Sequence, residues 1–232
     1  MVGHINRKGL LMFPTLTTPH DLRRLYNAVA PTWHSKIAAL GYTDAYRAAI
    51  AALIPKGRRP IRVMDVGCGA GSFARAYVQE RGRIEVLTLA DPAVDMLREA
   101  EARLIGDADE IVLLNSSIAD LPIFPSQDVI LCAHVLDHCA GPVRAIRALG
   151  ATLAPRGVIV LIVTKPHWCN WLIWPAWRHK SYPVSQIHEA VVAAGLTCPR
   201  DMGFASGPPR RTSHAYLITH QEPEIRYADC HR

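Results

Sequence analysis

The feature that most constrains the fold of this chain is a glycine-rich turn between an apolar run and a helical segment. Residues 61–66 have the apolar character of a short buried strand, and residues 71–81 have the pattern of a helix. Gly67, Gly69 and Gly71 lie at the junction. Glycine permits a tight bend there and lets a ligand lie against the main chain without a Cβ in the way. The helix that follows offers unpaired N–H groups to an anionic ligand group.

A second signal is Asp91, which follows the apolar run 84–90. A carboxylate at the end of this strand could accept hydrogen bonds from a ribose diol, so the two signals together predict a site for an adenosine cofactor. A dinucleotide fingerprint, G-x-G-x-x-G/A, would have its third small residue at position 72, which is Ser72. This chain instead has G-x-G-x-G, with Asp65 two residues before the first glycine. A nicotinamide-dependent oxidoreductase is therefore a disfavoured alternative.

The run 63–72 (VMDVGCGAGS) resembles motif I of the class I S-adenosylmethionine-dependent methyltransferases. Three later segments are similar to that family in the same order: 91–97 (DPAVDML), 128–138 (DVILCAHVLDH) and 153–160 (LAPRGVIV). The resemblance implies S-adenosylmethionine as the cofactor, with S-adenosylhomocysteine as the product. It implies methyl transfer by in-line displacement, which depends on alignment and exclusion of water. A methyltransferase-fold binding protein without turnover is the non-enzymatic alternative.

Strands and helices alternate along the chain, which predicts an α/β fold with a parallel sheet and helices on both faces. The resemblance implies a single Rossmann-like methyltransferase domain with a mostly parallel seven-stranded sheet and an antiparallel last strand. The expected strands are 61–66, 84–90, 111–115, 127–133, 157–164, 196–205 and 213–220, and the expected helices between them are 71–81, 92–104, 141–152 and 183–194. The last two strands are expected to pair as a hairpin across Gly207, Pro208 and Pro209.

The N-terminal part has helical periodicity over 21–30 and 35–53. Residues 26–33 (YNAVAPTW) resemble the opening of the ubiquinone and menaquinone biosynthesis C-methyltransferase branch, in which this segment covers the cofactor. The resemblance implies that Tyr26 contacts the cofactor and Trp33 the substrate, although ordinary helix packing would explain both residues. The predicted organisation is an N-terminal helical lid (1–57), a cofactor-binding core (58–222) with an aromatic insert (166–182), and a tail (223–232).

Composition narrows the class of protein further. The chain has 232 residues, half of them hydrophobic, and a formal net charge of +6. It has neither a long uninterrupted apolar run nor a signal-peptide pattern, and its six cysteines lack C-x-x-C spacing. These features favour a cytoplasmic protein with reduced thiols. The basic residues form no stripe with interleaved aromatics, so no nucleic-acid partner is expected.

The resemblance assigns cofactor contacts to four places. Asp65 would lie near the ammonium group of the cofactor, and Asp91 near the ribose, where it could also cap the next helix. Ser117 stands where the family often has an acid facing the adenine, and Asp120 is a candidate substitute. Ala133 would lie beside the transferring methyl group. The predicted cofactor-binding residues are Tyr26, Asp65, Gly67, Cys68, Gly69, Asp91, Pro92, Ser117, Ile118 and Ala133.

His134 and His138 are the candidate catalytic residues, because a neutral imidazole at either position could take a proton from the acceptor. For His138, a role in ordering the loop is favoured over a role as a base. The cluster also contains Cys132, Asp137 and Cys139, which invites a metal interpretation. Similar segments occur in metal-free members of the resembled family, so no metal is expected.

The segment 166–182 has Trp168, Trp171, Trp174 and Trp177 at every third position, followed by basic residues. Three interpretations remain open: an apolar wall of the substrate site, a peripheral contact with a membrane, or packing in the core or a dimer contact. The first assigns Trp168, Trp171 and Trp174 to substrate binding. The expected acceptor is a small apolar or amphipathic molecule, quinone-like or lipid-like.

Overall fold

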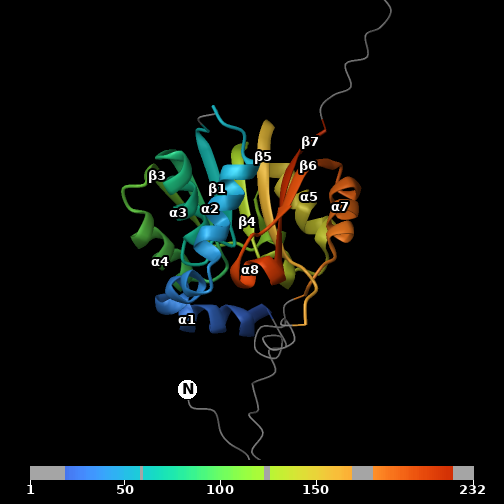
Figure 1. The fold of residues 1–232 in the computed structure, drawn as a ribbon. Helices are drawn as coiled ribbons and strands as arrows, with labels where there is room; N and C mark the ends of the chain where they lie inside the picture. The colour runs from blue at the N-terminus through green and yellow to red at the C-terminus, as the bar shows by residue number, and fades with distance from the viewer. Residues whose placement is uncertain (1–18, 58–59, 123–125, 169–179, 222–232) are drawn as a thin grey trace, which may run out of the picture.

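The computed structural model describes residues 19–57, 60–122, 126–168 and 180–221, which form a seven-stranded sheet flanked by helices (Figure 1). The strand order is β3-β2-β1-β4-β5-β7-β6. Strands β1 to β5 pair in parallel, whereas β7 is antiparallel to both β5 and β6. The strands are β1 (Arg62–Val66), β2 (Ile84–Ala90), β3 (Ala108–Leu114), β4 (Gln127–Ala133), β5 (Leu153–Thr164), β6 (Leu196–Gly203) and β7 (Ser213–His220). The predicted mostly parallel sheet is confirmed.

Helices cover both faces of the sheet, as the alternation of elements predicts. Helices α2, α3 and α4 pack on one face, and α5 and α7 pack on the other. Helix α1 lies across one end of the sheet (Figure 1). The helices are α1 (Pro19–Ala39), α2 (Tyr42–Leu53), α3 (Ser72–Arg81), α4 (Val94–Leu104), α5 (Pro142–Thr152), α7 (Val184–Ala193) and α8 (Gly207–Thr212), with short 3-10 turns η1 (Ile118–Asp120) and η2 (Leu136–His138). No helix in the described ranges is long and apolar enough to span a membrane.

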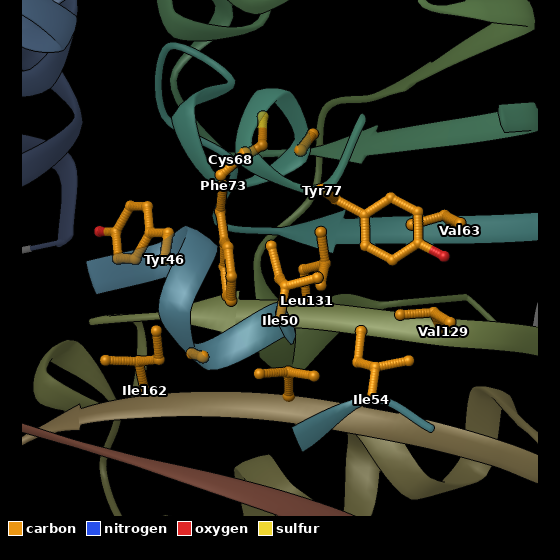
Figure 2. Close-up of a cluster of buried hydrophobic side chains, with 14 of the residues drawn as sticks. Tyr46, Ile50, Ile54, Val63, Cys68, Phe73, Tyr77, Val129, Leu131 and Ile162 are labelled. Atoms are coloured by element: carbon orange, nitrogen blue, oxygen red, sulfur yellow. The ribbon is translucent and has the colours of Figure 1, made fainter. Parts of the chain in front are cut away.

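The core consists of two layers because successive strand residues point to opposite faces of the sheet. In β4, Val129 and Leu131 belong to the layer under α2 and α3, whereas Ile130 and Cys132 belong to the layer under α5 and α7. Figure 2 shows the first layer, in which side chains of α2, including Ile50, face α3 and the central strands. This packing fixes the strand ends that carry the site.

Two local differences from the sequence prediction have clear causes. The expected second helix, 35–53, is interrupted at Gly41, whose left-handed backbone (φ 82°) separates α1 from α2. Helix α1 instead continues through Pro31. The predicted turn at Gly207 is the short helix α8, because proline is well suited to the first helical positions.

Candidate active site

A deep cavity of about 1000 Å³ opens at the carboxyl ends of the parallel strands. Its lining comes from the glycine turn after β1, the loop after β2, the loops after β3 and β4, and helices α1 and α2. Ligands of open α/β folds bind at this edge of the sheet. The volume is at the upper end of the range for small-molecule sites, so the cavity has room for more than one small ligand.

The glycine turn is held against the end of β2 by its own main chain. The N–H groups of Gly67 and Cys68 both donate to the carbonyl oxygen of Ala90, at 2.7 and 3.1 Å. Gly67 has a φ of 66°, and a Cβ at this position would lie 2.2 Å from Cγ2 of Val135. The need for glycine here therefore comes from the neighbouring protein side chain as well as from space for a ligand.

Asp91 joins the glycine turn to the start of α4. One of its carboxylate oxygens accepts from the Gly69 N–H at 2.9 Å, and the other accepts from the Ala93 N–H at 2.8 Å. Burial raises the pKa of Asp91 to about 6. Each carboxylate oxygen has a second lone pair, so the group can still accept hydrogen bonds from a ligand diol. The prediction that Asp91 also caps the next helix is wrong, because α4 begins at Val94 with Ala93 at its N-cap, and the bond to the Ala93 N–H closes the turn before the helix. The ribose contact stays a prediction for an acid that lines the cavity.

Asp65 is almost fully buried below the turn and also lines the cavity. Its carboxylate accepts from the Ala74 N–H at 3.0 Å, in the first turn of α3. Burial is the main cause that raises its pKa to about 7, and the nearby Asp91 carboxylate adds to the effect. A ligand cation beside Asp65 would favour the ionised form of this acid.

The predicted adenine side combines the two residues that the sequence offered as alternatives. The hydroxyl of Ser117 donates to a carboxylate oxygen of Asp120 at 2.6 Å, and both residues line the cavity. Pro92, Ile118 and Ala133 also line it. A serine bound to an acid three residues later can present a polarised hydroxyl where a carboxylate was expected.

Helix α1 covers the glycine turn through Trp33 and Tyr26. The indole nitrogen of Trp33 lies 3.3 Å from where a Cβ of Gly69 would be, so Trp33 faces the predicted cofactor side of the cavity. The rings of Tyr26 and Trp33 meet edge to face, with centroids 5.5 Å apart. The Tyr26 hydroxyl lies 3.0 Å from Nε2 of His138. Burial raises the pKa of Tyr26 and lowers that of His138, so a neutral phenol and a neutral imidazole share this hydrogen bond.

His134 stands at the end of β4 in a left-handed conformation (φ 59°), which is uncommon for a residue with a side chain. Its Nδ1 lies 3.1 Å from Oγ1 of Thr164 and 3.3 Å from Oδ2 of Asp137. The Thr164 hydroxyl donates to the same Asp137 carboxylate, so Nδ1 must supply the hydrogen to this group. Nε2 then carries the free lone pair, and it is buried without a partner among the described residues.

The structure brings together most of the predicted site residues, but Trp168 is not among them. Trp168 is 72% exposed, stacks beside His167 and is not among the cavity-lining residues. The predictions for Trp171 and Trp174 lie outside the described residues. Sequence reasoning did not assign Tyr42, whose ring packs edge to face against His134 at 5.2 Å, or Thr164. Thr164 could have been proposed from the sequence, because it ends the predicted strand 157–164 and strand ends of a parallel sheet lie at the site.

The sheet differs from a dinucleotide-binding Rossmann fold in its antiparallel β7, which lies between β5 and β6. With the glycine turn after β1, the acid after β2 and the cavity at the carboxyl edge, it is the sheet of the class I S-adenosylmethionine-dependent methyltransferases. A family described as "Methyltransferase domain" matches residues 39–198, and the chain belongs to this family. The predicted family and the predicted cofactor, S-adenosylmethionine, are confirmed.

Among curated relatives, the ubiquinone biosynthesis O-methyltransferase of Vibrio vulnificus is 30% identical over 98 residues, which cover 41% of this chain and 40% of that protein. An uncharacterised protein of Synechococcus is 32% identical over 134 residues, covering 56% and 30%. The chain thus matches less than half the length of these curated relatives.

Solved structures share the fold at low identity. Mitomycin 7-O-methyltransferase superposes with a TM-score of 0.69 at 19% identity, covering 88% of this chain and 61% of that one. Magnesium protoporphyrin IX methyltransferase from Synechocystis PCC 6803, crystallised with S-adenosylmethionine, has a TM-score of 0.69 at 16% identity and covers 90% and 100%.

Proposed function

We propose that this chain transfers the methyl group of S-adenosylmethionine to a hydroxyl oxygen of a small apolar or amphipathic acceptor. The observation that carries this proposal is the His134, Asp137 and Thr164 network at the wall of the cavity. In the reaction, the acceptor oxygen displaces the sulfur from the methyl carbon in line, and the hydroxyl proton passes to His134. The products are the methyl ether and S-adenosylhomocysteine, and the proton then leaves to solvent.

The cofactor lies along the glycine turn in this proposal. Asp65 accepts from the ammonium of its amino-acid end, and Asp91 accepts from its ribose hydroxyls. Ser117, polarised by Asp120, meets the adenine. The positive end of α3 favours the carboxylate of the cofactor. The sulfonium methyl then points past Ala133 toward the part of the cavity beside His134.

His134 is the proposed general base, in preference to His138. His138 Nε2 is already hydrogen-bonded to the Tyr26 hydroxyl at 3.0 Å, so His138 would have to break that bond before Nε2 could take a proton from the acceptor. His134 has its Nδ1 hydrogen committed to Thr164 and Asp137, which leaves Nε2 as an acceptor. An unpartnered buried nitrogen is costly, and a bound hydroxyl would satisfy it once the adjacent Tyr42 ring makes room. His138 then orders the loop under the lid.

The acceptor has an apolar body because the cavity beside His134 is lined by aliphatic and aromatic side chains. Ile37, Tyr42, Tyr46 and Phe73 provide this lining. The name of the Vibrio relative, a ubiquinone biosynthesis O-methyltransferase, supports a quinone-like acceptor with a ring hydroxyl. Amphipathic acceptors of this kind gather at membranes. A peripheral membrane contact through the insert 166–182 would therefore bring a cytoplasmic enzyme close to its acceptor.

In this proposal the lid of the N-terminal segment 1–57 is helix α1, because α2 packs in the core with Ala49 and Ile50 fully buried. The cofactor-binding core therefore comprises α2 together with residues 58–222. Helix α1 is tied to the site at two further points. Oδ1 of Asn27 accepts from the Asp95 N–H at 3.2 Å, and Nδ1 of His34 lies 2.9 Å from the Ser72 hydroxyl. These polar contacts and the small apolar cluster around Ala30 and Met96 bury less surface than the main core, so α1 can open more easily and allow the cofactor to enter.

The test is transfer of labelled methyl from S-adenosylmethionine to catechols with and without an apolar tail. His134→Gln should lower kcat by about 10²-fold or more, the usual contribution of a general base, with unchanged affinity for S-adenosylhomocysteine. His138→Gln is the matched control and should lower kcat much less. Equal turnover by wild type and His134→Gln would contradict the base assignment. Tight cofactor binding without transfer to any acceptor would favour the alternative of a binding protein.

A further inference from the structure

Four side chains with metal-binding atoms converge away from the cavity, at the other end of the strand order from β3. His188 comes from α7, Cys198 and Asp201 come from the edge strand β6, and His214 comes from β7. None of the four lines the cavity described above. Figure 1 shows α7 beside β6 and β7, so three elements meet where the cluster forms.

The ligand atoms are already close to one another. A ring nitrogen of His188, Sγ of Cys198 and a carboxylate oxygen of Asp201 all lie within 4.8 Å of each other. Nε2 of His188 is 2.9 Å from Oδ2 of Asp201. Nε2 of His214 is 2.8 Å from Oδ1, the other oxygen of the same carboxylate. The cluster thus has three groups whose ligand atoms converge, from His188, Cys198 and Asp201. The fourth residue, His214, is hydrogen-bonded to the other oxygen of the Asp201 carboxylate.

A break in the strand register brings Cys198 and Asp201 together. Residues three apart in a regular strand point to opposite faces of the sheet. In β6 the pairing with β7 shifts by one extra residue between Thr197 and Arg200. This bulge turns Cys198 to the face that carries Asp201, and bulges of this kind commonly redirect a side chain near a site.

Packing holds the two histidines in place. The ring of Tyr216, which is fully buried, lies 5.7 Å from the ring of His188 and 5.0 Å from the ring of His214. Rings packed in this way are already ordered in the folded protein, so they lose little further conformational entropy when an ion binds.

We propose that His188, Cys198 and Asp201 bind a divalent ion of the zinc class, with His214 orienting the Asp201 carboxylate. Nitrogen, sulfur and carboxylate donors are the set that Zn²⁺ prefers, and three protein ligands leave one position for water. Outer partners that hydrogen-bond a ligating carboxylate are the rule in such sites. Tetrahedral bonds of about 2.1 Å require His188 Nε2 and Asp201 Oδ2 to separate by roughly half an ångström.

Binding also requires a change of protonation that the site can make. The Cys198 thiol loses its proton to solvent when its sulfur bonds the ion, and the His188 hydrogen moves to Nδ1 so that Nε2 can coordinate. A sulfur-to-metal absorption therefore reports an ion bound through Cys198.

Co²⁺ titration of the full-length chain, purified without metal, tests the proposal. The wild-type protein should develop a near-ultraviolet sulfur-to-cobalt absorption and tetrahedral d–d bands, and stoichiometric Zn²⁺ should abolish both. Cys198→Ser should remove the sulfur-to-cobalt absorption, and Asp201→Asn should weaken Co²⁺ binding at least about tenfold. Cys139→Ser, which changes another half-buried thiol outside the cluster, should leave the spectrum as in wild type. His214→Gln should weaken binding less than Asp201→Asn.

The same titration can overturn the proposal. No cobalt absorption in wild type, or an unchanged spectrum in a Cys198→Ser protein with native circular dichroism, would mean that His188, Asp201 and His214 form only a hydrogen-bonded clamp between α7 and the sheet. Loss of methyl transfer does not enter this test, so its outcome is independent of the proposed activity.

Discussion

Replacement of Gly67 by alanine should destabilise the protein through a clash with one identified atom. The new Cβ would lie 2.2 Å from Cγ2 of Val135 but 3.4 Å from both other Val135 side-chain carbons. Relief of such an overlap costs about 1–3 kcal/mol, by analogy with overpacked cores. The positive φ of Gly67 adds roughly 1–2 kcal/mol for a residue with a Cβ. Gly67→Ala should therefore lower the free energy of unfolding by about 2–5 kcal/mol.

A double-mutant cycle separates the two costs. Val135→Ala removes Cγ2 and leaves only an ordinary contact, so Gly67→Ala should cost just the backbone part, about 1–2 kcal/mol, in that background. Urea denaturation followed by circular dichroism measures all four proteins. Gly41→Ala is the matched control, because Gly41 has a left-handed backbone with a φ of 82° and open space around it. A Gly67→Ala cost that is equal in both backgrounds, or equal to that of Gly41→Ala, would refute the reasoning.

Three further predictions concern the cavity. Because the pKa of Asp65 is raised to about 7, its contribution to the stability of the cofactor-free protein is complete below about pH 4 and lost as the pH rises through 7. Affinity for S-adenosylmethionine should change in the opposite sense and fall by up to about tenfold as calorimetry moves from pH 7 to pH 6, above the range in which Asp91 also takes up most of its proton. Asp65→Asn should flatten the profile over this range, and a flat wild-type profile would count against the ammonium contact. Trp33→Ala should weaken cofactor binding in fluorescence titrations. If only the KM for the acceptor changed, Trp33 would contact the substrate and not the cofactor. Replacing Trp171 and Trp174 together with alanine should reduce methylation of the acceptor or binding to liposomes, with cofactor affinity unchanged. If methylation and liposome binding both stayed at the wild-type level, the segment 166–182 would have only a structural role.

The sequence sufficed for the part of the site that depends on local order along the chain. The glycine turn and Asp91 each follow a predicted strand, and parallel strands bring their carboxyl ends to one edge of the sheet. The helix break at Gly41 was not predicted because the apolar periodicity of 35–53 runs through it. A single glycine inside such a pattern is usually tolerated, and its positive φ cannot be read from residue order.

Contacts between distant segments could not be derived in this way. Three contacts depend on how the loops pack after the sheet has formed. They are the close approach of Val135 to Gly67, the position of Trp33 over Gly69, and the hydrogen bond from Thr164 to Asp137. The bulge in β6 has the same character, because the extra residue is defined only against its partner strand. Such features require the tertiary structure, and they are where the site acquires its chemistry.

The most direct test of the central claim is calorimetry of this chain with S-adenosylhomocysteine, for wild type and for Asp91→Asn. Asparagine keeps the size of the side chain and one acceptor oxygen but removes the charge that should bind the ribose hydroxyls. Wild type should bind one equivalent, and Asp91→Asn should bind about 10- to 100-fold more weakly, the loss expected for hydrogen bonds to a charged group. NAD should not bind. Equal affinities in a folded Asp91→Asn protein, or binding of NAD in place of S-adenosylhomocysteine, would contradict the account.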